Sequence, residues 1–250
     1  MNCYIVTGAS RGLGLGIARA IVKQGGQLVA LARSESAELA ELGRQSPGYR
    51  FVALDLSDAQ RVADIAEELC GSLAGMAWQG VYLINNAGVV EPVAPAGAYD
   101  DAALITSIQV NLTSALVLNN AFLRHFQQHQ SDRRILNISS GAGRSPYPSW
   151  SAYCTGKAGL EMYSRCVGLE QQVHANGIRI ASIAPGIIDT GMQASIRSHS
   201  TDEFSMVEQF RAYKANGELS DPDTTGAEIL QVLHSDRVGF GEPLHIKDFR

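Results

Sequence analysis

A tyrosine and a lysine, Tyr153 and Lys157, stand four residues apart in this sequence, and the serine pair Ser139–Ser140 precedes them. Helix residues four apart lie on the same face, one turn from each other. A phenol ionises near pH ~10, but a nearby ammonium group favours the phenolate. The pair is therefore predicted to exchange a proton with a carbonyl oxygen, which a serine hydroxyl at a neighbouring strand end can hold.

A second pattern is the glycine-rich turn Thr7-Gly8-Ala9-Ser10-Arg11-Gly12-Leu13-Gly14, which follows a predicted strand and opens a predicted helix. Gly8 permits a tight turn, Gly12 lets backbone N–H groups approach a pyrophosphate, and Gly14 lets the helix pack close to the sheet. The helix N-terminus adds unpaired N–H groups and the positive end of its dipole. The segment predicts a dinucleotide site.

The choice of dinucleotide depends on the residues after the second predicted strand, Leu31-Ala32-Arg33-Ser34. An acidic residue there would hydrogen-bond the ribose of NAD, and this chain has Ala32 instead. Arg33, with Arg11 from the first turn, can pair with a 2′-phosphate, so we expect NADP(H). Glu35 argues the other way if the strand ends slightly later.

These residues need a scaffold, and short apolar runs between amphipathic stretches supply one. Runs buried on both faces indicate a parallel sheet, and alternation with helices indicates right-handed crossovers. We predict a single α/β domain over residues 1–250, a doubly wound Rossmann fold with a mostly parallel sheet of about seven strands and helices on both faces. The strand runs are Cys3–Val6, Gln27–Leu31, Arg50–Leu54, Gly80–Ile84, Arg134–Ile138 and Ile178–Ile183.

Composition narrows the functional classes. The chain has 250 residues, 45% of them hydrophobic, and a formal net charge of -5, which gives no electrostatic reason to expect nucleic-acid binding. No uninterrupted apolar run is long enough to cross a bilayer, and the start does not read as a signal peptide. Four cysteines lack the spacing of a disulfide framework or a zinc site, so we expect no metal and a cytoplasmic protein.

Taken in chain order, these motifs resemble the short-chain dehydrogenase/reductase family over nearly the whole chain. The order is the glycine turn, Asn85-Asn86-Ala87-Gly88, Asn111, the serine pair and Tyr153/Lys157. The resemblance implies that Ser140 polarises the substrate carbonyl, with Ser139 as second choice. Tyr153 would be the acid–base, and Lys157 would assist it and hold the nicotinamide ribose. Asn111 would position a proton-relay water near the lysine.

The same resemblance implies a set of cofactor contacts at the ends of successive strands. Asp55-Leu56 resembles the pair that contacts adenine, and Asn86 to Gly88 border the adenine ribose. The segment Pro185-Gly186-Ile187-Ile188-Asp189-Thr190 resembles the turn over the nicotinamide carboxamide. The expected cofactor-binding residues are Gly8, Ser10, Arg11, Gly12, Leu13, Gly14, Arg33, Asp55, Leu56, Asn86, Ala87, Gly88, Tyr153, Lys157, Pro185, Gly186, Ile188 and Thr190.

We expect the segment before Tyr153 and a loop at about 191–217 to determine the substrate specificity. Tyr147 and Trp150 would wall the site and suit a planar or aromatic ketone, unless Trp150 only packs under the loop. Within the family, the chain most resembles the sepiapterin reductases and bacterial benzil reductases, which reduce a vicinal dicarbonyl or its hydroxyketone equivalent. That resemblance adds three substrate candidates, with a solvated tail as the alternative for the last: Met192, Gln193 and Asp248.

Two other functions remain open at this point. One is a different reductase specificity, such as reduction of 3-oxoacyl thioesters. The other is a regulatory protein that senses NADPH without turning it over, which the complete catalytic set disfavours. In either case the partner is a small molecule, and the resemblance implies a homodimer or homotetramer built on the helices around 101–129 and 151–176.

Overall fold

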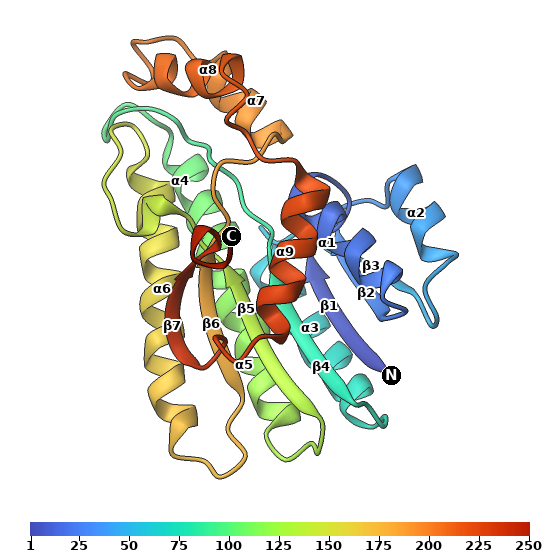
Figure 1. The fold of residues 1–250 in the computed structure, drawn as a ribbon. Helices are drawn as coiled ribbons and strands as arrows, with labels where there is room; N and C mark the ends of the chain where they lie inside the picture. Colours follow the sequence, from blue (N-terminus) through green and yellow to red (C-terminus); the bar gives the residue numbers. More distant parts are fainter.

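A computed structural model describes residues 1–250, and its centre is one seven-stranded sheet in which every neighbouring pair is parallel. The strand order is β3-β2-β1-β4-β5-β6-β7, so the order reverses between β1 and β4 (Figure 1). The six predicted strands are confirmed with ends shifted by one or two residues. The strands are β1 Asn2–Thr7, β2 Gln27–Ala32, β3 Arg50–Ala53, β4 Gly80–Asn85, β5 Asp132–Ile138, β6 Arg179–Ala184 and β7 Phe240–His245.

Helices cover both faces of the sheet, as predicted. On one face α1 (Gly12–Lys23) and α9 (Pro222–His234) pack over alternate strand residues, with α2 (Ala37–Gly43) beside them. The other face carries α3 (Ala59–Ala74), α5 (Ser114–Phe126) and α6 (Ser151–Gln172). Because each strand contributes apolar side chains to both layers, the strands read as continuous rather than alternating runs.

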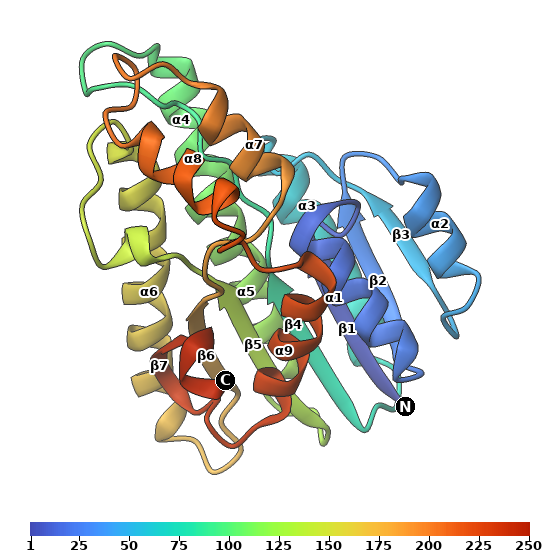
Figure 2. The ribbon, with the colours of Figure 1, turned by 45° about the horizontal axis from the view of Figure 1, so that its top comes forward.

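The predicted substrate loop is itself helical. It contains α7 (Gly191–Ser198) and α8 (Val207–Ala215), and Figure 2 shows this pair projecting above the sheet. We call residues 191–217 the cap. A third apolar cluster fixes the cap to the segment before α6, with Phe204 and Phe210 packed around Trp150. The sequence predicts a loop here, and the structure shows two helices instead.

The helix from Asp101 to Phe126 is continuous through α4 (Asp101–Ile108), a π-helical turn (Gln109–Thr113) and α5. This 26-residue helix is long and apolar enough to cross a membrane by length and composition. Polar residues such as Asn111 and Asn119 interrupt it, so it is not an uninterrupted apolar run of the kind that the sequence excludes. In this structure α5 packs against α3 and the sheet through residues such as Phe122, so the helix belongs to the fold's own layer.

Candidate active site

Every predicted cofactor or catalytic residue except those on α6 and Asn111 follows the carboxyl end of a strand. In a doubly wound sheet these ends meet at one edge, and the ligand crevice opens where the strand order reverses. Ser10 and Leu13 follow β1, Leu56 follows β3, and Pro185, Gly186 and Ile188 follow β6. The topology therefore brings residues far apart in the sequence to one edge of the sheet.

Three polar groups converge where α6 meets the end of β5. Tyr153 and Lys157 lie one turn apart on the buried face of α6, and Ser140 follows β5. The Lys157 ammonium donates to the Ile138 carbonyl oxygen at 2.8 Å, and its Nζ lies 5.7 Å from the centroid of the Tyr153 ring. The Ser140 side chain lies close enough to Tyr153 to affect its ionisation. Such a group can hold a carbonyl oxygen and give it a proton.

The protonation of this site differs from the sequence-based expectation. Burial raises the pKa of Tyr153 to about 12, although the hydrogen bond from Ser140 opposes the shift. Burial also lowers the pKa of Lys157 to about 8. Desolvation disfavours the charged forms of both side chains and is the largest cause of both pKa shifts. Tyr153 is a protonated phenol at neutral pH, as an unshifted phenol would also be.

The structure separates the two serines. The Ser139 hydroxyl is buried and donates to a carboxylate oxygen of Glu161 at 2.8 Å, away from Tyr153. The Ser140 hydroxyl faces the Tyr153 hydroxyl and also accepts the Ala142 N–H at 3.2 Å. Of the two hydroxyls, only that of Ser139 is engaged by Glu161, and the predicted action of Ser140 on the substrate oxygen stays a prediction.

Asn111 lies in the π-helical turn, buried beside the lysine. Its side-chain amide donates to the Val89 carbonyl at 2.8 Å and accepts the Val89 N–H at 2.9 Å. A Cβ on Gly88 would lie 2.9 Å from Asn111 Oδ1 and 3.4 Å from Lys157 Nζ. Glycine at that position therefore leaves room for both side chains. The relay water that the resemblance assigns to Asn111 remains a prediction.

The β1–α1 turn fits a pyrophosphate. No side chain caps the N-terminus of α1, and its first turn has no acidic residue, so its first N–H groups are available to an anion. A Cβ on Gly14 would overlap the Gly8 carbonyl oxygen, which explains the glycine there. The Thr190 methyl would lie 3.3 Å from a Cβ on Gly12, so the turn after β6 reaches across the same crevice.

Asn86 and Ala87 fix the glycine turn to the end of β4. The Thr7 hydroxyl accepts the N–H groups of Asn86 and Ala87 at 2.9 and 3.0 Å. The Asn86 amide donates in return to the Thr7 carbonyl at 2.9 Å. These bonds join β1 to β4 where the strand order reverses, so Thr7 is a positioning residue that sequence reasoning missed.

The adenosine end of the crevice is basic. Arg33 follows β2, Arg11 precedes α1, and both are exposed without an ion pair. Glu35 accepts the Tyr49 hydroxyl at 2.5 Å, so this carboxylate has a partner just before β3. The pKa of the Asp55 carboxyl is lowered mainly by hydrogen bonds from Ser57, with a smaller contribution from the charge of Arg33.

Trp150 is buried beneath the cap. Its ring stacks on Phe204 with centroids 4.8 Å apart and on Tyr147 at 5.1 Å, and it meets the Tyr153 ring edge-on at 5.6 Å. At 4% exposed it packs as the alternative interpretation supposed, while Tyr147 stays partly exposed. Trp150 therefore connects the position of the cap to the position of the Tyr153 ring.

The remaining substrate candidates lie in different surroundings. Met192 is half-buried on α7 against the aromatic cluster, and the buried Gln193 accepts from the Arg197 guanidinium at 3.1 Å within the same helix. Asp248 lies exposed in a short turn after β7, and its carboxylate has no hydrogen bond or ion pair. Its direction toward substrate remains a prediction.

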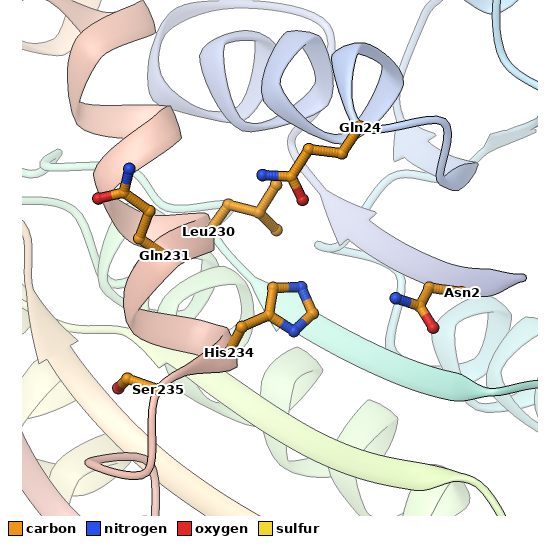
Figure 3. Close-up of a pocket in the computed structure, with 6 residues that line it drawn as sticks. All are labelled: Asn2, Gln24, Leu230, Gln231, His234 and Ser235. Carbon is orange, nitrogen blue, oxygen red and sulfur yellow. The ribbon is translucent and has the colours of Figure 1, made fainter.

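A polar surface hollow of about 510 Å³ lies at the opposite end of the molecule. It opens at the start of β1 and the last turns of α1 and α9, where His234 and Gln24 line it with Asn2 (Figure 3). The His234 ring shares a hydrogen bond of 2.9 Å with the Tyr4 hydroxyl. Since ligands of doubly wound sheets bind at the carboxyl ends, we assign this hollow no part in the reaction.

Comparison with known proteins identifies the family. A model of the short chain dehydrogenase family matches residues 2–201. The chain belongs to this family. This short-chain dehydrogenase is therefore an oxidoreductase that acts on CH–OH or C=O groups of a small molecule and binds a nicotinamide dinucleotide.

Two relatives and one solved structure resemble this short-chain dehydrogenase over nearly its full length. Benzil reductase ((S)-benzoin forming) of Bacillus subtilis is 35% identical, covering 100% of each chain. Sepiapterin reductase of Meriones unguiculatus is 32% identical over 98% of this chain and 95% of its own. The crystal structure of the KRED1-Pglu enzyme has a TM-score of 0.82 at 30% identity, covering 97% of this chain and 100% of that one. The predicted resemblance to benzil and sepiapterin reductases is confirmed.

Proposed function

We propose that this short-chain dehydrogenase is an NADPH-dependent reductase that converts one carbonyl of a vicinal dicarbonyl to a hydroxyl. The observation that carries the reaction class is the group formed by Tyr153 and Lys157 on the buried face of α6 with Ser140 at the end of β5. A phenol that is protonated at neutral pH can donate to a carbonyl oxygen, and both named relatives are reductases.

Each polar group around Tyr153 has a separate role in the proposed reduction. A bound reduced nicotinamide would supply the hydride. Ser140 holds the carbonyl oxygen by a hydrogen bond, and Tyr153 donates its proton to that oxygen as negative charge develops there. The Lys157 ammonium, in the same buried site, stabilises the phenolate left behind. Burial keeps water from competing for the proton and strengthens each of these interactions.

The preference for NADPH rests on charge at the end of β2. Arg33 and Arg11 have no ion pair in the protein, so both guanidinium groups are available to a 2′-phosphate. The carboxylate that could oppose them, Glu35, is held by the Tyr49 hydroxyl. NAD(H) would find no acidic partner for its ribose diol at Ala32.

The substrate class rests on the relatives and on the cap. Both named reductases match nearly the whole chain, cap included. Tyr147 and Met192, partly exposed around the buried Trp150, offer an apolar and aromatic boundary suited to a planar ketone.

NADPH oxidation with a carbonyl panel tests the proposal. Benzil and sepiapterin represent the dicarbonyl class and its hydroxyketone equivalent, and a 3-oxoacyl thioester represents the competing specificity. We expect turnover of at least one of the first two and a higher kcat/KM with NADPH than with NADH. Turnover of the thioester alone would overturn the substrate class, and NADPH binding without turnover of any carbonyl would indicate a sensor.

The reduction should depend on pH through Lys157. Its pKa of about 8 means that most of the Lys157 side chain is the ammonium below pH 8 and most of it is the neutral amine above pH 8. A neutral amine cannot stabilise the phenolate, so we expect kcat/KM for NADPH to be flat below that pH and to fall roughly tenfold per unit above it. Because kcat/KM reports the free enzyme, it is the parameter to measure. A rate that stays flat to pH 10 would contradict this role for Lys157.

Asp248 gives a test of pterin against diketone. If its carboxylate enters the cleft, it accepts N–H donors from a pterin ring, and loss of a charged hydrogen bond costs about 1.5–3 kcal/mol. We expect Asp248→Asn to raise KM for sepiapterin roughly 10–100-fold and to leave benzil nearly unchanged, because benzil has no N–H groups. Identical kinetics of variant and wild type on both substrates would return Asp248 to the solvated tail.

We also propose that the chain acts as a cytosolic homodimer or homotetramer. Large apolar side chains on neighbouring α4 and α6 face solvent in the single chain: Ile105, Met162, Leu169 and Val173. Burying them against a second copy removes the apolar face of the Asp101–Phe126 helix from water. The four free cysteines suit a reducing compartment. Sedimentation velocity of the purified chain would measure the assembly.

A further inference from the structure

One buried carboxylate, that of Glu161, holds both ends of the segment that carries Ser140. On one side it accepts the Ser139 hydroxyl at 2.8 Å. On the other side both of its oxygens accept the Arg144 guanidinium Nε–H, at 3.0 and 3.2 Å. Residues 139–144 therefore form a loop closed by a single side chain, with Ser140 inside the loop.

Glu161 also shares the face of α6 that carries the reacting groups. It stands four residues after Lys157 and eight after Tyr153, and all three side chains are buried. The loop packs tightly on that face, because a Cβ on Gly143 would lie 3.1 Å from the backbone of Lys157. The distance from Ser140 to the Tyr153 hydroxyl is thus set partly by how residues 139–144 sit on α6.

Strand β7 also contacts the loop of residues 139–144. The Arg144 guanidinium donates a further hydrogen bond to the Leu244 carbonyl oxygen at 3.0 Å, at the end of β7. Arg144 therefore ties the Ser140 loop to α6 and to the strand before the C-terminal turn. The carboxylate has a charged donor and a hydroxyl donor, which supplies the pairing that a buried charge requires.

We propose that Glu161 and Arg144 are positioning residues of the reductase, which hold the Ser140 hydroxyl on the oxygen that Tyr153 protonates. The proposal rests on the carbonyl reduction proposed above and adds two residues to it. Neither side chain touches the reacting atoms, so their effect passes through Ser140. Without the hydrogen bonds from Ser139 and Arg144 to Glu161, residues 139–144 would no longer hold Ser140 at a fixed distance from Tyr153.

Arg144→Met is the first test, because the Arg144 side chain is 35% exposed, and the Tm of the variant is measured beside kcat because the change leaves the Glu161 carboxylate without its charged partner. We expect kcat for any carbonyl that the wild type reduces to fall roughly 10–100-fold, since small misplacement of a catalytic group costs that much. The Kd for NADPH should stay unchanged. Glu161→Gln keeps the shape and removes the charge, and should show the same pattern with a Tm close to wild type.

A double-mutant cycle with Ser140→Ala separates positioning from general weakening. If Glu161 and Arg144 act through Ser140, Arg144→Met should lower kcat far less in the Ser140→Ala background than in the wild type. Equal losses in both backgrounds would overturn the proposal, as would an unchanged kcat for Arg144→Met alone. Arg124→Met is the matched control, because it breaks an exposed ion pair with Glu67 between α5 and α3, remote from Ser140.

The failure of this inference differs from failure of the proposed function. If the wild type reduces neither dicarbonyl but reduces another ketone, the cycle is run on that ketone and still decides the role of Arg144. If the wild type reduces a dicarbonyl and the cycle shows no coupling, only the positioning role is lost.

Discussion

Replacing Tyr153 with phenylalanine should lower kcat for carbonyl reduction by roughly 10²–10⁴-fold, the usual contribution of a positioned acid–base group. The change removes one oxygen from a side chain that is 7% exposed and leaves the ring, which packs edge-on against Trp150. Because the ring stays in place, the cap and the cofactor crevice should keep their shape. The Kd for NADPH should therefore change little.

The measurement is single-turnover NADPH oxidation beside a fluorescence titration of NADPH binding. Tyr163→Phe is a matched control, since Tyr163 lies on the same helix but packs into the layer between α6 and the sheet, away from Ser140. Near-normal turnover by Tyr153→Phe would show that another group supplies the proton. Equal damage from both variants would point to a change in α6 rather than in the chemistry.

Reversing the charge of Arg33 should weaken NADPH by roughly 100-fold at low salt, from a lost charge-assisted bond and a new repulsion. NADH lacks the 2′-phosphate and should change far less, so the ratio of the two kcat/KM values should shift toward NADH. Salt should shrink the difference, because Arg33 is exposed and its field is screened.

Arg33→Asp is compared with Arg179→Asp, which makes the same change of charge at the amino end of β6, whereas Arg33 follows the carboxyl end of β2. Only the first variant should alter the ratio of NADPH to NADH. If the two dinucleotides lose affinity equally, Arg33 lies outside the 2′-phosphate pocket and the cofactor preference must come from elsewhere.

Much of this site could be predicted from the sequence because its parts are local. The turn from Gly8 to Gly14 needs only glycines between a strand and a helix, and the spacing of Tyr153 and Lys157 needs only one helical turn. Strands buried on both faces are continuous apolar runs, so six of them could be located. The fold class then places their carboxyl ends at one edge.

What the sequence could not supply depends on contacts between distant segments. The cap was predicted as a loop because the apolar residues of α7 and α8 are few, and only packing around Trp150 gives these helices a partner. The spacing could have shown part of the proposed positioning pair, because Glu161 stands four residues after Lys157 on the same face of α6. It could not have shown that Arg144 is the partner of Glu161, because the two residues lie on different segments.

The sequence by itself determined the order and chemistry of the motifs, because backbone turns and helix spacing follow from neighbouring residues. Only the tertiary structure decided that the two serines have different surroundings, since Glu161 accepts the hydroxyl of Ser139. It also decided that burial raises the pKa of Tyr153 and lowers that of Lys157. Burial and hydrogen-bond direction are properties of packed surroundings, which form when segments far apart in the chain come together.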